Sequence, residues 1–178
     1  MTLTEAIVVR MSHDLAGAVG AVANTLDLIK MDSSFLADSV ELLETSSQQL
    51  TARLNFFRAL FGAETKSIDN ALLKRYLATL AITVDFKGEV SNRNQLALVA
   101  VGLELLGVKG QIKLTQNKLV IQGDNLHHDP IYFQVLVGNP IPCEPKWVMA
   151  LWLHEVARQS NLSVQIEADD EKITLSLV

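Results

Sequence analysis

Apolar residues recur at alternating spacings of three and four along the first part of the chain, with polar residues between them. An α-helix turns once in about 3.6 residues, so this spacing predicts one long amphipathic helix over residues 4–31. The apolar positions cluster within roughly 80° of arc around the helix axis. They are Val8, Met11, Leu15, Val19, Val22, Leu26 and Ile29.

A second helix follows after Asp32, Ser33 and Ser34, whose side chains readily bond the free N–H groups at the start of a helix. Its apolar series has one polar step, Ser47, and Gly62 favours an end of the helix there. The two helices predict an antiparallel hairpin over residues 1–65. Its apolar surface exceeds what one partner helix covers, so we expect two chains to form a four-helix bundle. The series is Leu36, Val40, Leu43, Leu50, Leu54, Phe57 and Phe61.

The pattern changes after residue 65, where shorter helical and strand-like segments alternate. The fold class is therefore α+β, with a helical hairpin followed by an α/β sandwich over 66–178. The expected order is a helix over 69–80, a strand over 82–86, a helix over 94–106, paired strands over 111–115 and 118–123, a strand or buried extended segment over 131–137, a helix over 145–160 and a hairpin from 162–168 and 172–178.

Composition narrows the class of protein. Hydrophobic residues make up 49% of the 178 residues, enough for an ordinary core, and the net charge of -5 argues against nucleic-acid partners. The single Cys143 and the charged N-terminal sequence MTLTEAIVVRMSHD favour a reducing cytoplasm. No run approaches the roughly 20 uninterrupted apolar residues that span a bilayer, so we expect no direct membrane contact.

His13 points about 160° away from the centre of the apolar arc, so it is expected to face solvent. An exposed histidine combines a near-neutral pKa with a nucleophilic ring nitrogen that can accept a phosphoryl group. Gly17, Gly20 and Asn24 follow on the same stripe, and each glycine costs about 1 kcal/mol in a helix interior. The stripe indicates a docking surface for another protein. Alternatively, the glycines only allow close helix packing and His13 is an ordinary surface residue.

The string RMSHDLAGAVGAVANTLDLI resembles the phosphoacceptor helix of histidine kinases, and more closely that of alphaproteobacterial ChpT-type histidine phosphotransferases. The end of the second helix, LNFFRALFGAE, also resembles that family, so the resemblance covers most of residues 8–64. It implies that His13 is the phosphorylated residue and Asp14 its acidic neighbour, which hydrogen-bonds the ring or favours its protonated form. The alternative for Asp14 is a solvated helix charge.

The resemblance also implies that the second domain is a degenerate kinase-type ATPase domain. The chain lacks the glycine-rich loops that cradle phosphates: Gly123-Asp124-Asn125 has no following glycines, and the helix from Asn94 has no second asparagine. Ala18 and Gly17 stand where sensor kinases usually have proline and where phosphatase-competent ones often have threonine or asparagine. Neither autokinase nor phosphatase activity is therefore expected.

The sequence thus predicts a cytoplasmic, homodimeric histidine phosphotransferase that relays phosphoryl groups between response-regulator aspartates, supplied by a hybrid histidine kinase. It needs no cofactor of its own, because the receiver domains provide the magnesium. Two alternatives are a non-catalytic, receiver-binding pseudokinase dimer and a true histidine kinase with a diverged ATP site. Metal sites at His127-His128-Asp129 or His154-Glu155 are disfavoured, since neither shows a full ligand set.

Overall fold

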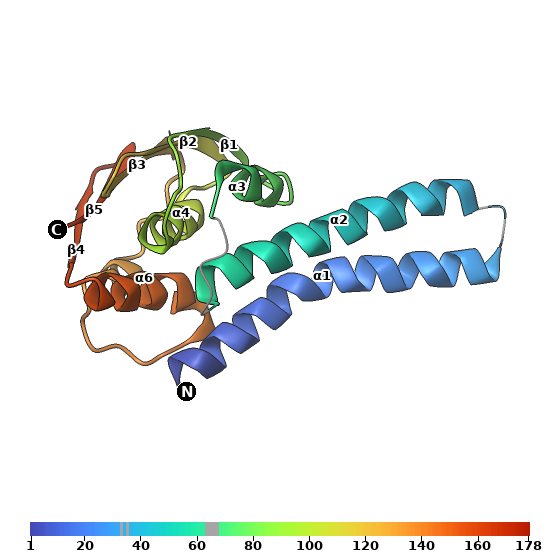
Figure 1. Cartoon of the computed structure of the whole chain (residues 1–178), viewed down its shortest axis with the longest axis horizontal. Coiled ribbons are helices and arrows are strands. Elements are labelled where there is room, and N and C mark those ends of the chain that lie inside the picture. Colours follow the sequence, from blue (N-terminus) through green and yellow to red (C-terminus); the bar gives the residue numbers. More distant parts are fainter. Residues whose placement is uncertain (33, 35, 63–67) are drawn as a thin grey trace.

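In the computed structural model, which describes residues 1–32, 34, 36–62 and 68–178, two long antiparallel helices extend from a mixed α/β body (Figure 1). Helix α1 spans Leu3–Met31 and α2 spans Leu36–Phe61, so both predicted helices are confirmed. A reciprocal cap fixes the start of α1, because Thr2 accepts from the Glu5 amide and Glu5 accepts from the Thr2 amide. Ser33 and the linker 63–67, with the predicted domain boundary, lie outside the described residues.

The body is built on one five-stranded sheet with strand order β1-β2-β3-β5-β4. Strands β1 and β2 are parallel, and every other neighbouring pair is antiparallel. The predicted α+β class is thereby confirmed. The elements are α3 (Asn70–Leu77), β1 (Thr83–Lys87), α4 (Arg93–Leu105), β2 (Lys109–Leu114), β3 (Lys118–Asp124), α5 (Pro130–Leu136), the 3-10 turn η2 (Pro145–Trp147), α6 (Val148–Gln159), β4 (Val164–Ala168) and β5 (Lys172–Leu177).

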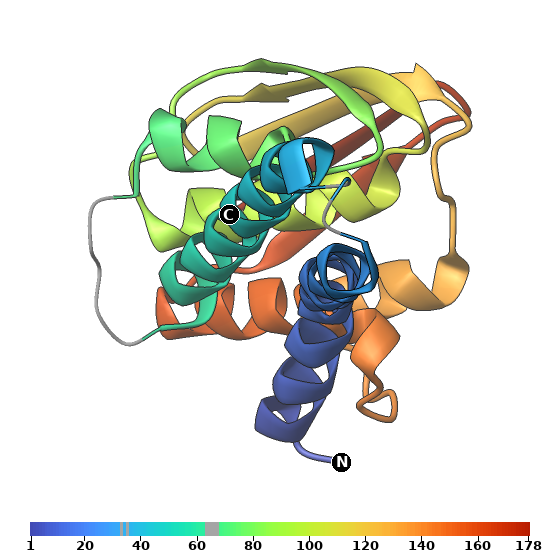
Figure 2. The ribbon, with the colours of Figure 1, turned by 90° about the vertical axis from the view of Figure 1, so that its right-hand side faces the viewer.

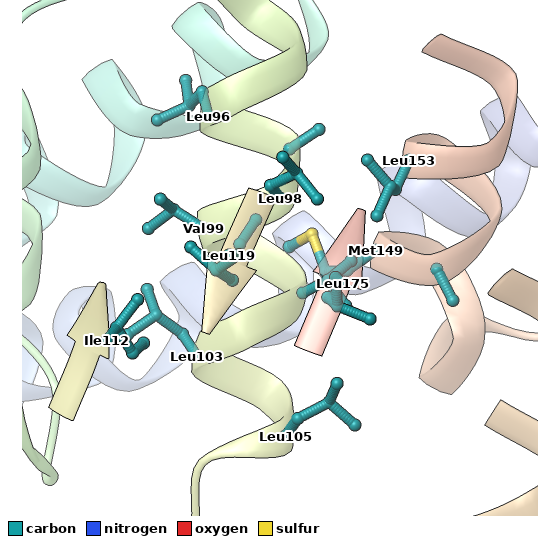
Figure 3. Close-up of a cluster of buried hydrophobic side chains, with 14 of the residues drawn as sticks. Leu96, Leu98, Val99, Leu103, Leu105, Ile112, Leu119, Met149, Leu153 and Leu175 are labelled. Atoms are coloured by element: carbon teal, nitrogen blue, oxygen red, sulfur yellow. The ribbon is translucent and has the colours of Figure 1, made fainter. Parts of the chain in front are cut away.

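Helices α4 and α6 cover one face of the sheet and form the main hydrophobic core with it (Figure 3). Helix α4 is buried on most of its surface, because it packs against the sheet, α6 and the end of α2. Leu119 of β3 and Leu175 of β5 point from the sheet toward α4, and Met149 approaches from α6. This core holds α4 in a fixed position, which matters for the site.

The prediction of a strand or buried extended segment over 131–137 is wrong, because this part of the chain forms helix α5. The Asp129 carboxylate accepts from the amides of Ile131 and Tyr132, at 2.8 and 3.3 Å, and Pro130 occupies the first turn. Both features favour a helix start. A short apolar run has no clear period of its own, so periodicity alone could not separate a buried strand from this helix.

The hairpin has a base within the core and an outer half that projects from it (Figures 1 and 2). At the base, Phe56 and Leu60 of α2 are fully buried. In the outer half the seam between the helices consists of small residues spaced seven apart: Ala18 and Thr25 on α1, Ser39 and Ser46 on α2. Many of the large apolar residues there point outward instead: Val19, Leu26, Leu28, Leu36, Val40 and Leu42.

By length and composition, one helix among the described residues, α1, could cross a membrane. Core helices and signal sequences pass the same test. In the structure α1 packs along α2, and its Arg10 reaches Glu104 in α4, so its first half is joined to the body by a charged contact. The expected absence of direct membrane contact stays a prediction.

Candidate functional site

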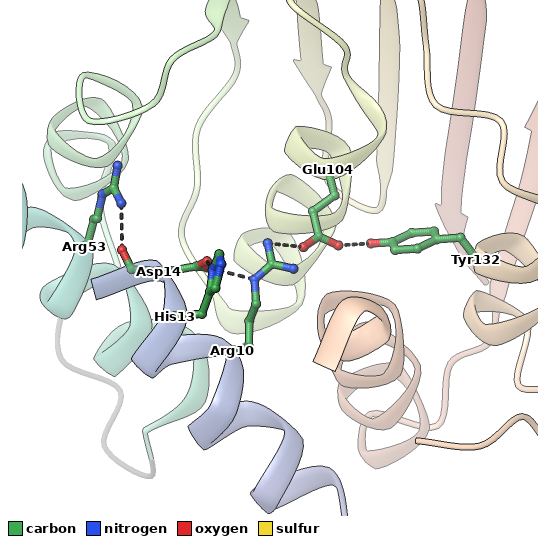
Figure 4. Close-up of polar contacts among 6 residues, drawn as sticks. All are labelled: Arg10, His13, Asp14, Arg53, Glu104 and Tyr132. Carbon is green, nitrogen blue, oxygen red and sulfur yellow. Dashed lines mark hydrogen bonds and ion pairs between the residues drawn. The ribbon is translucent and has the colours of Figure 1, made fainter. Parts of the chain in front are cut away.

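His13 is an exposed residue of α1 and lies beside Arg10 and Asp14, where the hairpin meets the body (Figure 4). It is 86% exposed, so the predicted orientation is confirmed. Its Nδ1 lies 3.2 Å from Oδ1 of Asp14. This contact is a hydrogen bond to the carboxylate when Nδ1 carries the proton, and the Nε2 lone pair is then free.

Asp14 is held from several directions rather than solvated. The Arg10 guanidinium, one helical turn earlier, donates from Nε to the second carboxylate oxygen, Oδ2, at 2.9 Å. The Asp14 main-chain carbonyl accepts from Nη1 of Arg53 on α2 at 2.7 Å. The alternative of a solvated helix charge therefore does not describe Asp14.

A network of polar and charged side chains runs from Asp14 into the body. Nη2 of Arg10 forms an ion pair with Oε1 of Glu104 on α4, at 2.9 Å, and Oε2 of Glu104 accepts from the hydroxyl of Tyr132 on α5 at 2.6 Å. Burial raises the pKa of Glu104, while the ion pair with Arg10 opposes that shift. Burial also raises the pKa of Tyr132, and the neighbouring Glu104 carboxylate adds to the effect. A cavity of about 380 Å³ lies beside this network. It is lined by Arg10, Glu104, Leu105, His127, Asp129, Tyr132 and Lys146.

Arg53 of α2 joins the backbone at Asp14 to the segment that follows α3. Its Nη2 donates to the Thr79 carbonyl, beyond α3, at 2.7 Å, and thus connects that segment to the Asp14 backbone. Three residues after Arg53 on α2, the ring of Phe56 stacks on Tyr76 of α3 with centroids 3.6 Å apart. Burial raises the pKa of Tyr76 to about 12, so this phenol is neutral over the ordinary pH range.

The predicted docking residues Gly17, Gly20 and Asn24 lie on α1 beyond His13, and none is buried in the single chain. A Cβ atom placed on Gly17 or Gly20 would meet no other atom within 4 Å. Close packing within the chain therefore does not explain either glycine. Their role in docking another protein stays a prediction.

The structure brings together no metal site among the residues it describes, in which no cluster of three or more His, Cys, Asp and Glu side chains occurs. Asp129 caps α5, and Glu155 pairs with Arg158. In the region compared with kinase glycine loops, Gly123 pairs with Gly110 across β2 and β3, and a Cβ on Gly123 would lie 2.6 Å from the Lys109 carbonyl oxygen. This glycine thus permits close strand contact.

The sequence reasoning missed Arg10, Arg53, Glu104 and Tyr132. The Arg10–Asp14 pair could have been found, since charges four residues apart meet on a helix surface. The other three residues come from elements far apart in the sequence. Only the packed fold brings them to α1.

No protein-family model matches the chain, and no curated protein matches it. Among solved structures, a bacterial phosphotransferase superposes with a TM-score of 0.79, at 21% identity over 99% of this chain and 95% of that one. The chain therefore has the fold of that phosphotransferase, and the resemblance predicted from the sequence is confirmed at the level of the fold.

Two histidine kinases superpose less well. The Acinetobacter baumannii kinase AdeS gives a TM-score of 0.38 at 11% identity, over 93% of this chain and 95% of the other. A kinase from Burkholderia phymatum STM815 gives 0.34 at 15% identity, over 94% and 96%.

Proposed function

We propose that the chain is a histidine phosphotransferase of a phosphorelay, in which His13 carries the phosphoryl group between receiver-domain aspartates. The observation that carries the proposal is the exposed His13 ring with Nδ1 directed at Asp14, on a chain that has the fold of a phosphotransferase. An acceptor histidine must be reachable by another protein's active site, and its attacking nitrogen must be unprotonated. The position of His13 meets the first need, and the Asp14 contact supports the second.

The chemistry is two successive transfers. Nε2 of His13 attacks the phosphorus of a receiver's aspartyl phosphate; the new N–P bond forms as the acyl P–O bond breaks, and the aspartate leaves as a carboxylate. In the second step a carboxylate of another receiver attacks the phosphorus, and the N–P bond breaks. The receivers supply magnesium and a lysine for the transferred charge, so this chain contributes the nucleophile, its orientation and a docking surface.

A homodimer completes the proposal. The outward apolar residues of the hairpin, such as Val19 at 51% and Leu26 at 44% exposure, would leave a large apolar surface in water on a monomer. A two-fold pairing of hairpins buries that surface with the same residues from both copies, which gives a four-helix bundle. His13 and its glycine stripe lie about 160° from the apolar arc, so pairing leaves them free.

The remaining parts of the proposal follow from this role. The partners are response-regulator receivers and a hybrid histidine kinase in the cytoplasm, with no nucleic acid, no direct membrane contact and no cofactor resident in this chain. The pseudokinase-like alternative predicts receiver binding without phosphoryl transfer. The kinase alternative predicts binding of Mg-ATP well below millimolar concentration and labelling from ATP alone.

The deciding experiment supplies a phosphorylated cognate receiver, prepared with radiolabelled phosphate, to the full chain. An acid-labile, base-stable label should appear on the wild type and disappear completely in His13→Ala. His128→Ala is the matched control, because it removes another exposed histidine and should label normally. Label that persists in His13→Ala, or no label on the wild type with any receiver of the same genome, would contradict the proposal.

A further inference from the structure

We propose that Glu104, on α4 in the body, is a positioning residue for His13 on the hairpin, which deepens the proposed function and rests on it. The polar partners of Glu104 are Arg10 and Tyr132, and it makes no hydrogen bond or ion pair with His13 among the described residues. It acts through Arg10, whose guanidinium bridges the carboxylates of Glu104 and Asp14 with ion-pair distances of 2.9 Å to each (Figure 4).

The two carboxylate oxygens of Asp14 have different partners. Oδ2 accepts from Arg10, and Oδ1 faces Nδ1 of His13 at 3.2 Å. Because Arg10 occupies one oxygen, the carboxylate cannot turn freely about its last bond, and the other oxygen stays directed at the ring. An oriented acceptor at Nδ1 favours the tautomer with hydrogen on Nδ1 and the lone pair on Nε2, the nitrogen that faces solvent.

Arg10 alone could not hold this arrangement. An arginine side chain has many rotamers, and a single arginine–carboxylate pair four residues apart stabilises an isolated helix only weakly. Glu104 supplies the second anchor, and that anchor is rigid, because Oε2 accepts from the buried Tyr132 hydroxyl at 2.6 Å and α4 is packed into the core. The body of the protein thus sets the orientation of the His13 ring. In the same way, a residue that accepts a hydrogen bond from a metal-bound histidine fixes the orientation of that ring.

The test measures the His13 tautomer directly, with no receiver present. Two-bond nitrogen–hydrogen couplings of ¹⁵N-labelled protein at neutral pH give the share of ring with the proton on Nδ1. The exposed His128, which has no carboxylate hydrogen bond among the described contacts, serves as the reference in the same spectrum. Wild-type His13 should show a larger Nδ1–H share than His128. In Glu104→Gln, which keeps the shape and an oxygen for Tyr132 but loses the charge, the His13 share should fall toward that of His128.

Glu155→Gln is the matched control, since it removes a carboxylate paired with Arg158 on α6 and should leave His13 unchanged. With a phosphorylated receiver at saturation, Glu104→Gln should transfer about tenfold more slowly than the wild type, by analogy with the loss of a residue that orients a metal-binding histidine. Tyr132→Phe, which keeps Glu104 charged and removes only its neighbour's hydroxyl, should shift both readouts in the same direction by less. If Glu104→Gln fails to fold, Tyr132→Phe decides alone.

A wild-type tautomer share equal to that of His128, or no shift in the folded variants, overturns the inference and leaves the proposed function standing. Absence of labelling on wild-type His13 instead overturns the proposed function, whatever the tautomer.

Discussion

The base and the outer half of the helical hairpin are built from the same apolar periodicity but differ in what covers it. At the base, Phe56 and Phe57 are no more than 1% exposed, because α4, α3 and α6 surround the end of α2. In the outer half Val19, Leu26 and Val40 each leave more than two fifths of their surface in water. Periodicity thus locates an apolar face, whereas the topology decides whether the same chain or another one covers it.

The intrachain seam sharpens this difference. The outer halves of α1 and α2 meet through Ala18, Thr25, Ser39 and Ser46, whose small side chains let the helices lie close. The large apolar side chains are thereby left on a neighbouring face of each helix. Such a division is expected where one face contacts the same chain and the next face contacts a second one.

The largest effect is expected at the base. Phe56→Ala should lower the free energy of unfolding by about 3–5 kcal/mol, since it leaves a cavity in the core and removes the stack with Tyr76. Urea titration followed by circular dichroism measures the change. Arg58→Ala, an exposed position two residues further on, should cost less than about 0.5 kcal/mol. A loss under about 1 kcal/mol for Phe56→Ala would mean that the base is less tightly packed than the structure has it.

A substantial effect on assembly is expected in the outer half. Leu26→Asp should weaken the dimer at least about 100-fold, near 2.7 kcal/mol, because each copy would place a carboxylate in the apolar interface. Sedimentation or light scattering over a concentration series measures it. Asn24→Asp adds the same charge on the face of His13, and the dimer should persist. A wild-type chain that is monomeric and folded at micromolar concentration would contradict the proposed dimer.

The same comparison explains which parts of the fold were predictable. Both long helices and the β2–β3 hairpin follow from period and turn residues, so sequence sufficed for Leu3–Met31 and Lys109–Asp124. The segment 131–137 was predicted as a strand or extended segment instead of a helix, because its short apolar run has no clear period. Asp129 and Pro130 are nevertheless typical of a helix start. The seam of small residues was not predicted, because Ala, Ser and Thr do not stand out in a pattern of large apolar side chains.

The candidate site divides in the same way. His13 and Asp14 are adjacent in the sequence, and the exposure of His13 follows from its angle on the helix. Glu104 and Tyr132 reach the site only because α4 and α5 pack beside α1, so no local pattern indicated them. Local sequence thus predicts the proposed nucleophile, while the tertiary fold determines which residues from other elements lie beside it.

The smallest effect concerns the glycines, and it compares the outer half of the hairpin with the core of the body through one kind of substitution. Gly20→Ala should raise the free energy of unfolding by up to about 1 kcal/mol, because alanine favours the helix and its methyl group meets nothing within 4 Å. Gly102→Ala, in the core helix α4, should have the opposite sign, since its Cβ would lie 2.5 Å from Cδ2 of Leu119. Thermal melts of both variants measure the contrast.

Gly20→Leu extends this test to function, because its side chain would stand about two turns from His13 on the same stripe. The dimer should remain intact while transfer from a phosphorylated receiver slows, since in the proposed function the receiver docks on that surface to bring its aspartate to the ring. Melting temperature and transfer rate are measured on the same samples. If folded Gly20→Leu transfers phosphoryl groups at the wild-type rate, the stripe of Gly17, Gly20 and Asn24 is not part of the docking surface. Loss of the dimer would show that Gly20 admits the second copy of the chain, and the outer half would then use both faces of α1 for assembly.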